Sequence, residues 1–369
     1  MKMLTKKANL FRVINNLYFN KKEPISLVHF ITNRCNARCS FCFVDFDNPD
    51  TFKGELSLDE INKLTKNLGK SLLNLNLTGG EPFVRKDIID IAKIYLKNTL
   101  IQSIYITTNA SFPDRIEAFA KSINSIDREL EINIQISIDE LPEKHDKIRR
   151  IKNLFDNCLD TYRRIHKLNL ENVNPVISIT VSLENCDNIE NIFYYLTLKC
   201  KFDSLKCSIV RDEGIYKTPF EKKRKIYDAY TWLTGKIQEM TKDKVINNYN
   251  LKSIQGRLHN KKDNIAWDMI NKAYMEPQYI SPCHAGSLFG IITSNGLVYP
   301  CEILEDRMLG NLRENDMDFM KIWNNKFNKE TKKFIIKSKC NCTYECALSY
   351  NILGNWRYQP QLVKAAIGY

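Results

Sequence analysis

The segment Cys35-Asn-Ala-Arg-Cys39-Ser-Phe-Cys42 places three cysteines within eight residues, in the spacing C-x3-C-x2-C. Thiolates grouped in this way can hold an iron–sulfur cluster, and three of them leave one iron of a 4Fe–4S cluster open for chemistry. A zinc site usually uses C-x2-C pairs and four protein ligands, and a disulfide would leave one of the three cysteines unpaired. The spacing therefore favours a cluster at Cys35, Cys39 and Cys42.

A second motif, Gly79-Gly-Glu-Pro82, directly follows the largely apolar segment 72–78. Alone it is a weak signal, but the order and distance of the two motifs resemble the radical S-adenosylmethionine (radical SAM) superfamily. The resemblance covers roughly residues 25–215, with a second stretch near the C-terminus. It implies that the cysteine loop follows the first strand of a barrel. It also implies that the amino and carboxylate groups of SAM chelate the open iron.

The resemblance further implies which residues contact SAM. Phe41 stands before the third cysteine, where the family usually has an aromatic residue. Gly79, Gly80 and Glu81 would place the methionine end of SAM, because glycines let the backbone approach a ligand closely. The Glu81 carboxylate would accept hydrogen bonds from the ammonium group. We therefore expect Glu81→Gln to weaken SAM binding with little loss of fold.

Two further positions follow from the resemblance. Ser137 and Asp139, at the end of the fourth expected strand, match the ribose-contacting position, and Asn185 is a candidate on the adenine side. Ordinary capping of a strand end is the alternative for Ser137 and Asp139. No acid or base is assigned beyond the cluster ligands. Four titratable residues lie near the expected sites in sequence only, and a structural role is favoured for each: Asp212, Glu213, His284 and Glu302.

The composition is that of a globular chain. Its 369 residues, 43% of them hydrophobic, suffice for one large or two ordinary domains. No apolar run reaches the length of a membrane span, and the polar N-terminus does not resemble a signal peptide, so we expect a cytoplasmic protein. The net charge of +12 could indicate nucleic acid. The chain is rich in Lys throughout, however, and basic clusters such as 221–225 fit a helix surface, so nucleic-acid binding is disfavoured.

The twelve cysteines indicate metal binding rather than disulfides in a chain without a secretion signal. Eight of them fall into two groups, at 35–42 and 283–346. The other four are scattered and are expected to be buried or incidental thiols: Cys158, Cys186, Cys200 and Cys207.

Residues 25–215 alternate between strand and helix patterns. Such alternation predicts a parallel α/β sheet with right-handed crossovers. Six strands are too few to close an eight-stranded barrel, so we expect a partial (β/α)6 TIM-like barrel. The expected strands are 25–32, 72–78, 102–108, 131–139, 175–183 and 204–210. The expected helices are 57–68, 86–97, 113–124, 146–168 and 188–199.

The strands alternate apolar and polar residues, unlike the continuous apolar runs of strands covered on both faces. Within 131–139, for example, isoleucines alternate with Asn133, Gln135 and Ser137. We expect the apolar face to meet the helices and the polar face to line a lumen for a polar cofactor and substrate. Tyr105 points to this lumen and could meet substrate, although a packing role is equally favoured. Half-exposed antiparallel strands are the alternative, which the intervening helices disfavour.

The rest of the chain is expected to form three further units. Residues 1–24 are a polar lead-in, 216–280 a helical bridge, and 281–369 a small iron–sulfur domain with a tail. Asn295-Gly296, between two apolar segments, predicts a β-hairpin. A helix is expected at 316–335.

The C-terminal cysteines resemble the twitch or SPASM extensions of radical SAM enzymes, which bind auxiliary 4Fe–4S clusters. The last three form C-x-C-x3-C, shorter than the cysteine pattern of the full two-cluster extension, so we expect one auxiliary cluster. Cys283, Cys301 and Cys346 are expected to bind, with Cys342 favoured over Cys340 as the fourth ligand. A structural zinc knuckle using the same residues is the alternative.

These features predict a radical SAM oxidoreductase that cleaves SAM to methionine and a 5′-deoxyadenosyl radical and takes a hydrogen atom from its substrate. The favoured reaction is dehydrogenation or cross-linking of a small polar metabolite or sugar, because 34 residues before Cys35 cannot form a leader-binding domain. A peptide or protein maturase without that domain is an alternative. A non-catalytic zinc or iron–sulfur binding protein is another. The resemblance implies a flavodoxin- or ferredoxin-type electron donor.

Overall fold

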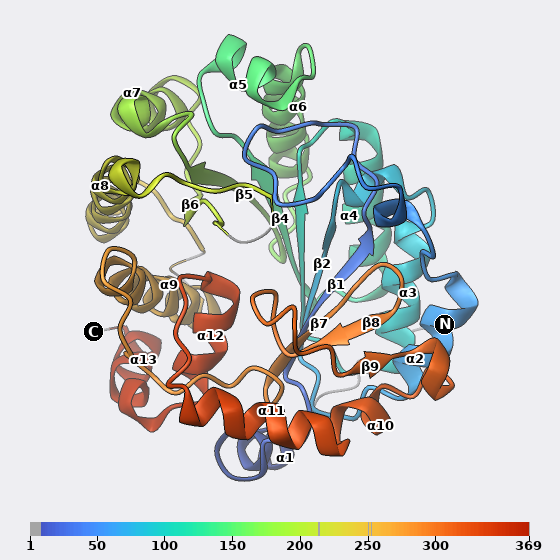
Figure 1. Ribbon diagram of the computed structural model, residues 1–369. Coiled ribbons are helices and arrows are strands. Elements are labelled where there is room, and N and C mark those ends of the chain that lie inside the picture. The colour runs from blue at the N-terminus through green and yellow to red at the C-terminus, as the bar shows by residue number, and fades with distance from the viewer. Residues whose placement is uncertain (1–8, 213–214, 250, 252, 369) are drawn as a thin grey trace.

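The computed structural model describes residues 9–212, 215–249, 251 and 253–368. Glu213 and the first eight residues of the expected lead-in lie outside them. In the described part of the chain, nine strands form one sheet in the order β6-β5-β4-β3-β2-β1-β7-β8-β9. The strands from β1 to β6 are parallel, and helices α2 to α6 pack along their outer side (Figure 1). This is the expected α/β partial barrel.

Each of the six expected barrel strands is present. They are Ser26–Thr32 (β1), Asn74–Gly79 (β2), Ser103–Thr108 (β3), Glu131–Ser137 (β4), Val173–Val181 (β5) and Leu205–Ile209 (β6). The apolar positions are in register: Leu75 pairs with Ile104, and Ile104 pairs with Ile132. All three are fully buried in the core that the outer helices share. The neighbouring polar positions, such as Tyr105 and Asn133, therefore face the lumen.

The barrel helices are Leu58–Lys66 (α2), Ile88–Asn98 (α3), Pro113–Ile126 (α4), Pro142–Arg149 (α5), Leu154–Lys167 (α6) and Ile189–Tyr194 (α7), the last continuing as a π-helix over Tyr195–Lys199. The expected capping box before α2 is formed by Ser57 and Glu60. The single helix expected over 146–168 is wrong. Arg150 and Asn153 have left-handed φ values of 57° and 60°, which interrupt a helix and separate α5 from α6.

The C-terminal hairpin joins the barrel sheet. Its strands are Phe289–Ile292 (β7) and Leu297–Tyr299 (β8), followed by Gly310–Asn311 (β9). Gly296 occupies the turn with a φ of +87°, as the Asn-Gly pair predicts. β7 pairs in parallel with β1, from Ser26 opposite Phe289 onward. This pairing gives β1 a second neighbour and removes an unpaired strand edge beside the cysteine loop.

The remaining helices are Leu10–Asn15 (α1), Lys223–Lys242 (α8), Ile254–Ala273 (α9), Phe319–Trp323 (α10), Lys326–Lys337 (α11), Glu345–Leu353 (α12) and Gln359–Ile367 (α13). The helix expected over 316–335 is thus two helices. α9 and α12 lie across the open side of the barrel, between β6 and β7 (Figure 1). Tyr350 of α12 donates a hydrogen bond of 2.8 Å to Asn74 of β2. A side chain of α12 therefore reaches the N-terminal end of the lumen.

Candidate active site

The GGEP loop packs directly against the chain that leads into the cysteine loop. The backbone N–H groups of Gly80 and Glu81 donate to the carbonyls of Thr32 and Arg34, each at 2.9 Å. A Cβ atom would lie 1.9 Å from the Thr32 carbonyl oxygen at Gly79 and 2.3 Å from the Arg34 carbonyl oxygen at Gly80. Only glycine fits either position. The two glycines thus hold the two motifs together, a role that sequence reasoning missed when it assigned them to ligand approach alone.

Glu81 has structural partners for both carboxylate oxygens. Oε1 accepts from the Thr108 hydroxyl at 2.7 Å and from the Phe83 N–H at 3.1 Å, and Oε2 accepts from the Asn109 N–H at 2.7 Å. The residue is 1% exposed. Burial raises the pKa of Glu81 to about 7, while the three donors act in the opposite direction. The effect of Glu81→Gln on the fold stays a prediction, but these contacts now favour a loss of stability, because this carboxylate joins the ends of β2 and β3.

The three cysteines of the first motif lie beside this junction as free thiols. Burial raises the pKa of all three thiols, that of Cys35 to about 12. Cys35 Sγ accepts a hydrogen bond from the Ala37 N–H at 3.3 Å, and Asn109 Nδ2 lies 3.9 Å from it. Such donors stabilise a thiolate once iron displaces its proton. Phe41, 9% exposed, belongs to the hydrophobic core.

Asp139 is fully buried and its carboxylate is already bonded. Oδ2 accepts from the Arg149 guanidinium at 2.6 and 2.9 Å, and Oδ1 accepts from the Thr180 N–H at 3.0 Å. Arg149 also approaches the cysteine loop, because its carbonyl accepts from the Arg38 N–H at 3.2 Å. These contacts agree with the alternative role of Asp139, which is capping of a strand end. Ser137 lies at the same strand end and is 9% exposed.

Asn185 is also committed to the protein itself. Its side chain accepts from the Ser182 N–H at 2.9 Å and donates to the carbonyls of Asp139 and Thr180 at 2.8 and 2.9 Å. It joins the ends of β4 and β5. The assignments of Ser137, Asp139 and Asn185 to SAM remain predictions.

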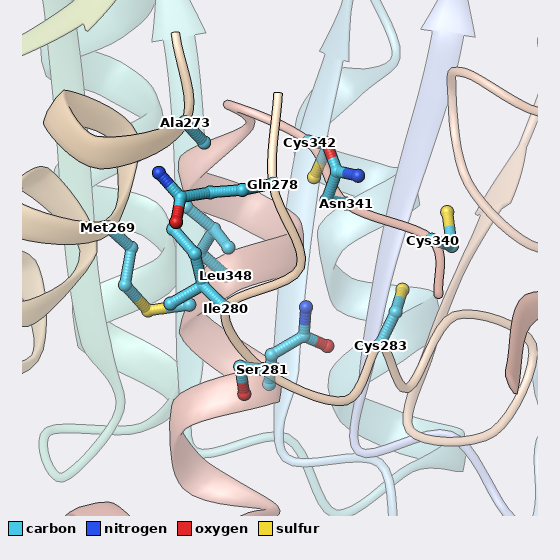
Figure 2. A pocket seen from close by; sticks show the side chains of 11 residues that line it. Met269, Ala273, Gln278, Ile280, Ser281, Cys283, Cys340, Asn341, Cys342 and Leu348 are labelled. Atoms are coloured by element: carbon cyan, nitrogen blue, oxygen red, sulfur yellow. The ribbon is translucent and has the colours of Figure 1, made fainter. Parts of the chain in front are cut away.

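The five C-terminal cysteines gather around one cavity. Cys283, Cys301, Cys340, Cys342 and Cys346 line it. The segments carrying them come from both sides of β7 and from the chain between α11 and α12. The Cys283 and Cys340 thiols interact with each other, and Figure 2 shows both residues at the edge of a second cavity that they line. Burial raises the pKa of Cys342 to about 12 and that of Cys346 to about 11.

These donors fit an iron–sulfur cluster as the sequence predicts. In the described part of the chain, no three His, Cys, Asp or Glu side chains converge at the geometry of a single metal ion. The five thiols instead surround a shared space, and four suffice to close a 4Fe–4S cluster. The preference for Cys342 over Cys340 as the fourth ligand stays a prediction.

Arg211, just after β6, lies between the two groups of cysteines, and sequence reasoning missed it. Its guanidinium lies 5.1 Å from the ring centroid of Phe43, the residue after Cys42. It lies 4.4 Å from the ring of Tyr344, which precedes Cys346 by two positions. It also forms an ion pair with Glu302, the residue after Cys301. One side chain thus contacts a neighbour of each cysteine loop.

A charged network occupies the lumen and was not predicted either. His259 of α9 lies 3.3 Å from the Glu131 carboxylate, and the Tyr105 hydroxyl lies 3.4 Å from His259 Nδ1. Beside them, the Asp263 carboxylate lies 3.9 Å from Lys206 of β6. Glu131 and Tyr105 carried a sequence signal because they alternate with isoleucines. The α9 residues carried none, because only the packing of the bridge brings them inside the barrel.

Two thiol-lined sites on a parallel α/β sheet, one of them at the strand ends beside a GGEP loop, define an iron–sulfur enzyme of the partial-barrel class. Residues 30–193 match the family model of the radical SAM superfamily, and residues 283–347 match that of the SPASM iron–sulfur cluster-binding domain. The chain belongs to the radical SAM superfamily and carries a C-terminal SPASM domain. Its cofactors are therefore a 4Fe–4S cluster and SAM, with auxiliary iron–sulfur cluster binding in the SPASM domain.

The chain is similar to several proteins of known role. The sporulation killing factor maturation protein SkfB of Bacillus subtilis is 26% identical over 304 residues, which cover 80% of this chain and 64% of SkfB. The Fe-coproporphyrin III synthase of Methanosarcina barkeri is 29% identical over 178 residues, 48% of this chain and 42% of that protein. The chain thus spans less than two thirds of either relative.

Solved structures share the fold. The structure of anSMEcpe with bound AdoMet superposes with a TM-score of 0.62 at 18% identity, covering 94% of this chain and 96% of that one. Streptococcus suis SuiB bound to its precursor peptide SuiA gives a TM-score of 0.55 at 17% identity, covering 88% and 70%. Among the described residues, no helix has both the length and the apolar character needed to cross a membrane.

Proposed function

We propose that this chain is a radical SAM enzyme that oxidises a side chain of a peptide substrate. The placement of Arg211 carries the proposal, because its contacts with Phe43, Tyr344 and Glu302 link a neighbour of each cysteine group. The similarity to SkfB over 80% of the chain supports a peptide rather than a free metabolite. This choice reverses the order in which the sequence alone ranked the two substrate classes.

When bound, the first cluster and SAM would supply a 5′-deoxyadenosyl radical that takes a hydrogen atom, and the auxiliary cluster would supply an acceptor for the remaining electron as a proton leaves to solvent. Cys35, Cys39 and Cys42 would hold the first cluster, with Glu81 fixing the loop behind it. Arg211 would orient substrate in the space between the two sites. The rings of Phe43 and Tyr344 hold its guanidinium and limit water there.

The experiment is anaerobic reconstitution with iron, sulfide, SAM and dithionite, followed by measurement of 5′-deoxyadenosine. We expect its formation, and none above background in a variant with Cys35, Cys39 and Cys42 all changed to alanine. Candidate peptides encoded beside the gene are then added, and their mass is expected to fall by about two hydrogens per modification. A protein that binds zinc without sulfide would refute the proposal.

A small polar metabolite is the second candidate. The charged lumen network around Glu131, His259 and Asp263 favours it, because polar groups inside the barrel can bind a polar ligand. The two candidates differ in what triggers SAM cleavage. A metabolite extract that raises 5′-deoxyadenosine formation while peptides do not would favour the second.

A further inference from the structure

Helix α11 presents a lysine-rich face to solvent. Between Lys321 and Lys339 the sequence holds seven lysines and one acidic residue, Glu330. Lys326, Lys329, Lys333 and Lys337 lie within one stripe of the helix, because their spacing follows its period. Asn328, Thr331 and Ile335 are the buried residues of α11 on its opposite side.

These four lysines and Lys339, which we call the basic face, are exposed. None of them enters an ion pair among the residues that the structure describes. Apolar side chains lie among them: Ile336 is 75% exposed and Phe334 is 37% exposed. Arg307 adds a further cation, 4.0 Å from the Phe334 ring centroid. A basic stripe with exposed apolar side chains beside it has the composition of a docking surface.

The basic face ends at the auxiliary cysteines. Lys339 directly precedes Cys340, and the Cys340 N–H donates to the Ile335 carbonyl at 3.1 Å, so the last turn of α11 holds the cysteine loop. Cys283, Cys340 and Cys342 also line a second, partly open cavity, which Figure 2 shows. Asn341 lies at this cavity and is exposed. Part of the thiol site therefore opens beside the basic face.

We propose that the basic face is the docking surface of an acidic one-electron carrier protein, which exchanges electrons with the auxiliary cluster through the Cys340–Cys342 edge. The inference deepens the proposed function and rests on its auxiliary cluster. The electron that the substrate leaves in that cluster passes to the oxidised carrier, which becomes reduced, and no bond forms or breaks.

Charge complementarity selects this occupant. Opposite charges on two proteins steer their encounter and raise the association rate, while a small interface keeps the complex short-lived. Weak redox complexes use interfaces of this small class. A nucleic acid would also meet the lysines, but it would gain nothing from an adjoining redox site.

The test compares two charge-reversal variants of the reconstituted holoenzyme. The first changes Lys329, Lys333 and Lys337 of the basic face to glutamate. The matched control changes three equally exposed lysines in and after α2, Lys63, Lys66 and Lys70. The probe is an acidic flavodoxin in its reduced form, and stopped-flow spectroscopy follows electron transfer to the iron–sulfur centres. Photoreduced 5-deazaflavin serves as a small reductant that needs no docking surface.

We expect the basic-face variant to lose at least about tenfold in flavodoxin-dependent rate at low ionic strength, and to lose its salt dependence. Reduction by deazaflavin should stay unchanged, as should both rates in the control variant. Equal flavodoxin rates in all three proteins, or equal losses in both variants, would overturn the proposal. Loss of binding to a single-stranded oligonucleotide with unchanged flavodoxin rates would assign the face to nucleic acid instead.

The test separates this proposal from the proposed function. It uses neither SAM nor substrate, so failure to modify a peptide leaves its outcome unaffected. Iron and sulfide analysis of the same samples reports the clusters directly. Calorimetric binding of the oxidised flavodoxin, abolished in the basic-face variant and kept in the control, measures docking without electron transfer.

Discussion

The guanidinium of Arg211 lies 4.4 Å from the centroid of the Tyr344 ring. These residues come from the end of β6 and from the loop before α12, so the contact ties the barrel to the SPASM domain. The Arg211–Glu302 ion pair adds a second tie, next to Cys301. A fixed positive charge thus lies near the auxiliary thiols, where it favours negative charge.

Arg211→Gln is expected to lower the reduction potential of the auxiliary cluster, because a nearby cation stabilises the reduced, more negative state. Loss of the two ring contacts should also cost roughly 1 kcal/mol of local stability. A redox titration followed by electron paramagnetic resonance measures the potential. Arg211→Lys should lower the potential less, because lysine keeps the positive charge. An unchanged potential in Arg211→Gln would show that the cation has no electrostatic influence on the cluster.

Glu81→Gln is expected to destabilise the fold. The new amide would place an N–H group against a backbone N–H or a hydroxyl, so at least one buried hydrogen bond is lost at a cost of about 1–3 kcal/mol. Urea unfolding of the wild type and the variant measures this difference. The control is Ser40→Ala, which removes the exposed hydrogen bond from the cysteine loop to Glu184. If Glu81→Gln unfolds like the wild type but binds SAM more weakly by calorimetry, the original ligand role would be right.

Removal of Cys283 and Cys301 together is expected to remove one cluster. Reconstituted wild type should hold about eight irons per chain, and the double alanine variant about four. SAM cleavage should persist, because the first three cysteines are untouched. Iron and sulfide analysis checks both numbers. A wild-type protein that holds only about four irons after careful reconstitution would contradict a separate auxiliary cluster.

The pair Glu60–Arg313 joins α2 to the chain after β9, and its contribution should depend on pH. The hydrogen bond from Arg313 holds the pKa of Glu60 at about 2. An unfolded glutamate titrates near about 4.3, so the unfolded state binds the proton first as pH falls. The stabilisation is therefore present at neutral pH and is lost as the pH falls from about 4.3 to about 2.

Glu60→Gln isolates this pair, because glutamine can still complete the capping box with Ser57. We expect a loss of about 0.2–1 kcal/mol at neutral pH, since both side chains are partly exposed. Urea unfolding at decreasing pH should show the difference from wild type shrinking. In a double-mutant cycle, Arg313→Gln should add little to Glu60→Gln. A difference that stays constant down to about pH 3 would rule out the ion pair as its cause.

The sequence by itself determined the local chemistry. The spacing of Cys35, Cys39 and Cys42 predicted the first thiol group, and the alternation of strand and helix patterns over residues 25–215 predicted the parallel barrel. The turn at Asn295-Gly296 was likewise predictable from these two residues alone. These features depend on neighbours in the chain, where backbone geometry fixes which side chains lie together.

Only the tertiary structure decided what distant segments do to one another. It paired β7 with β1, although the hairpin was expected in a separate domain. It gave Glu81 and Asp139 internal partners, brought His259 into the barrel lumen, and placed Arg211 between the two cysteine groups. Hydrogen-bond partners of a buried polar group come from whichever strand or helix packs against it. That packing is set by the sheet order and the helix positions, which no short motif encodes.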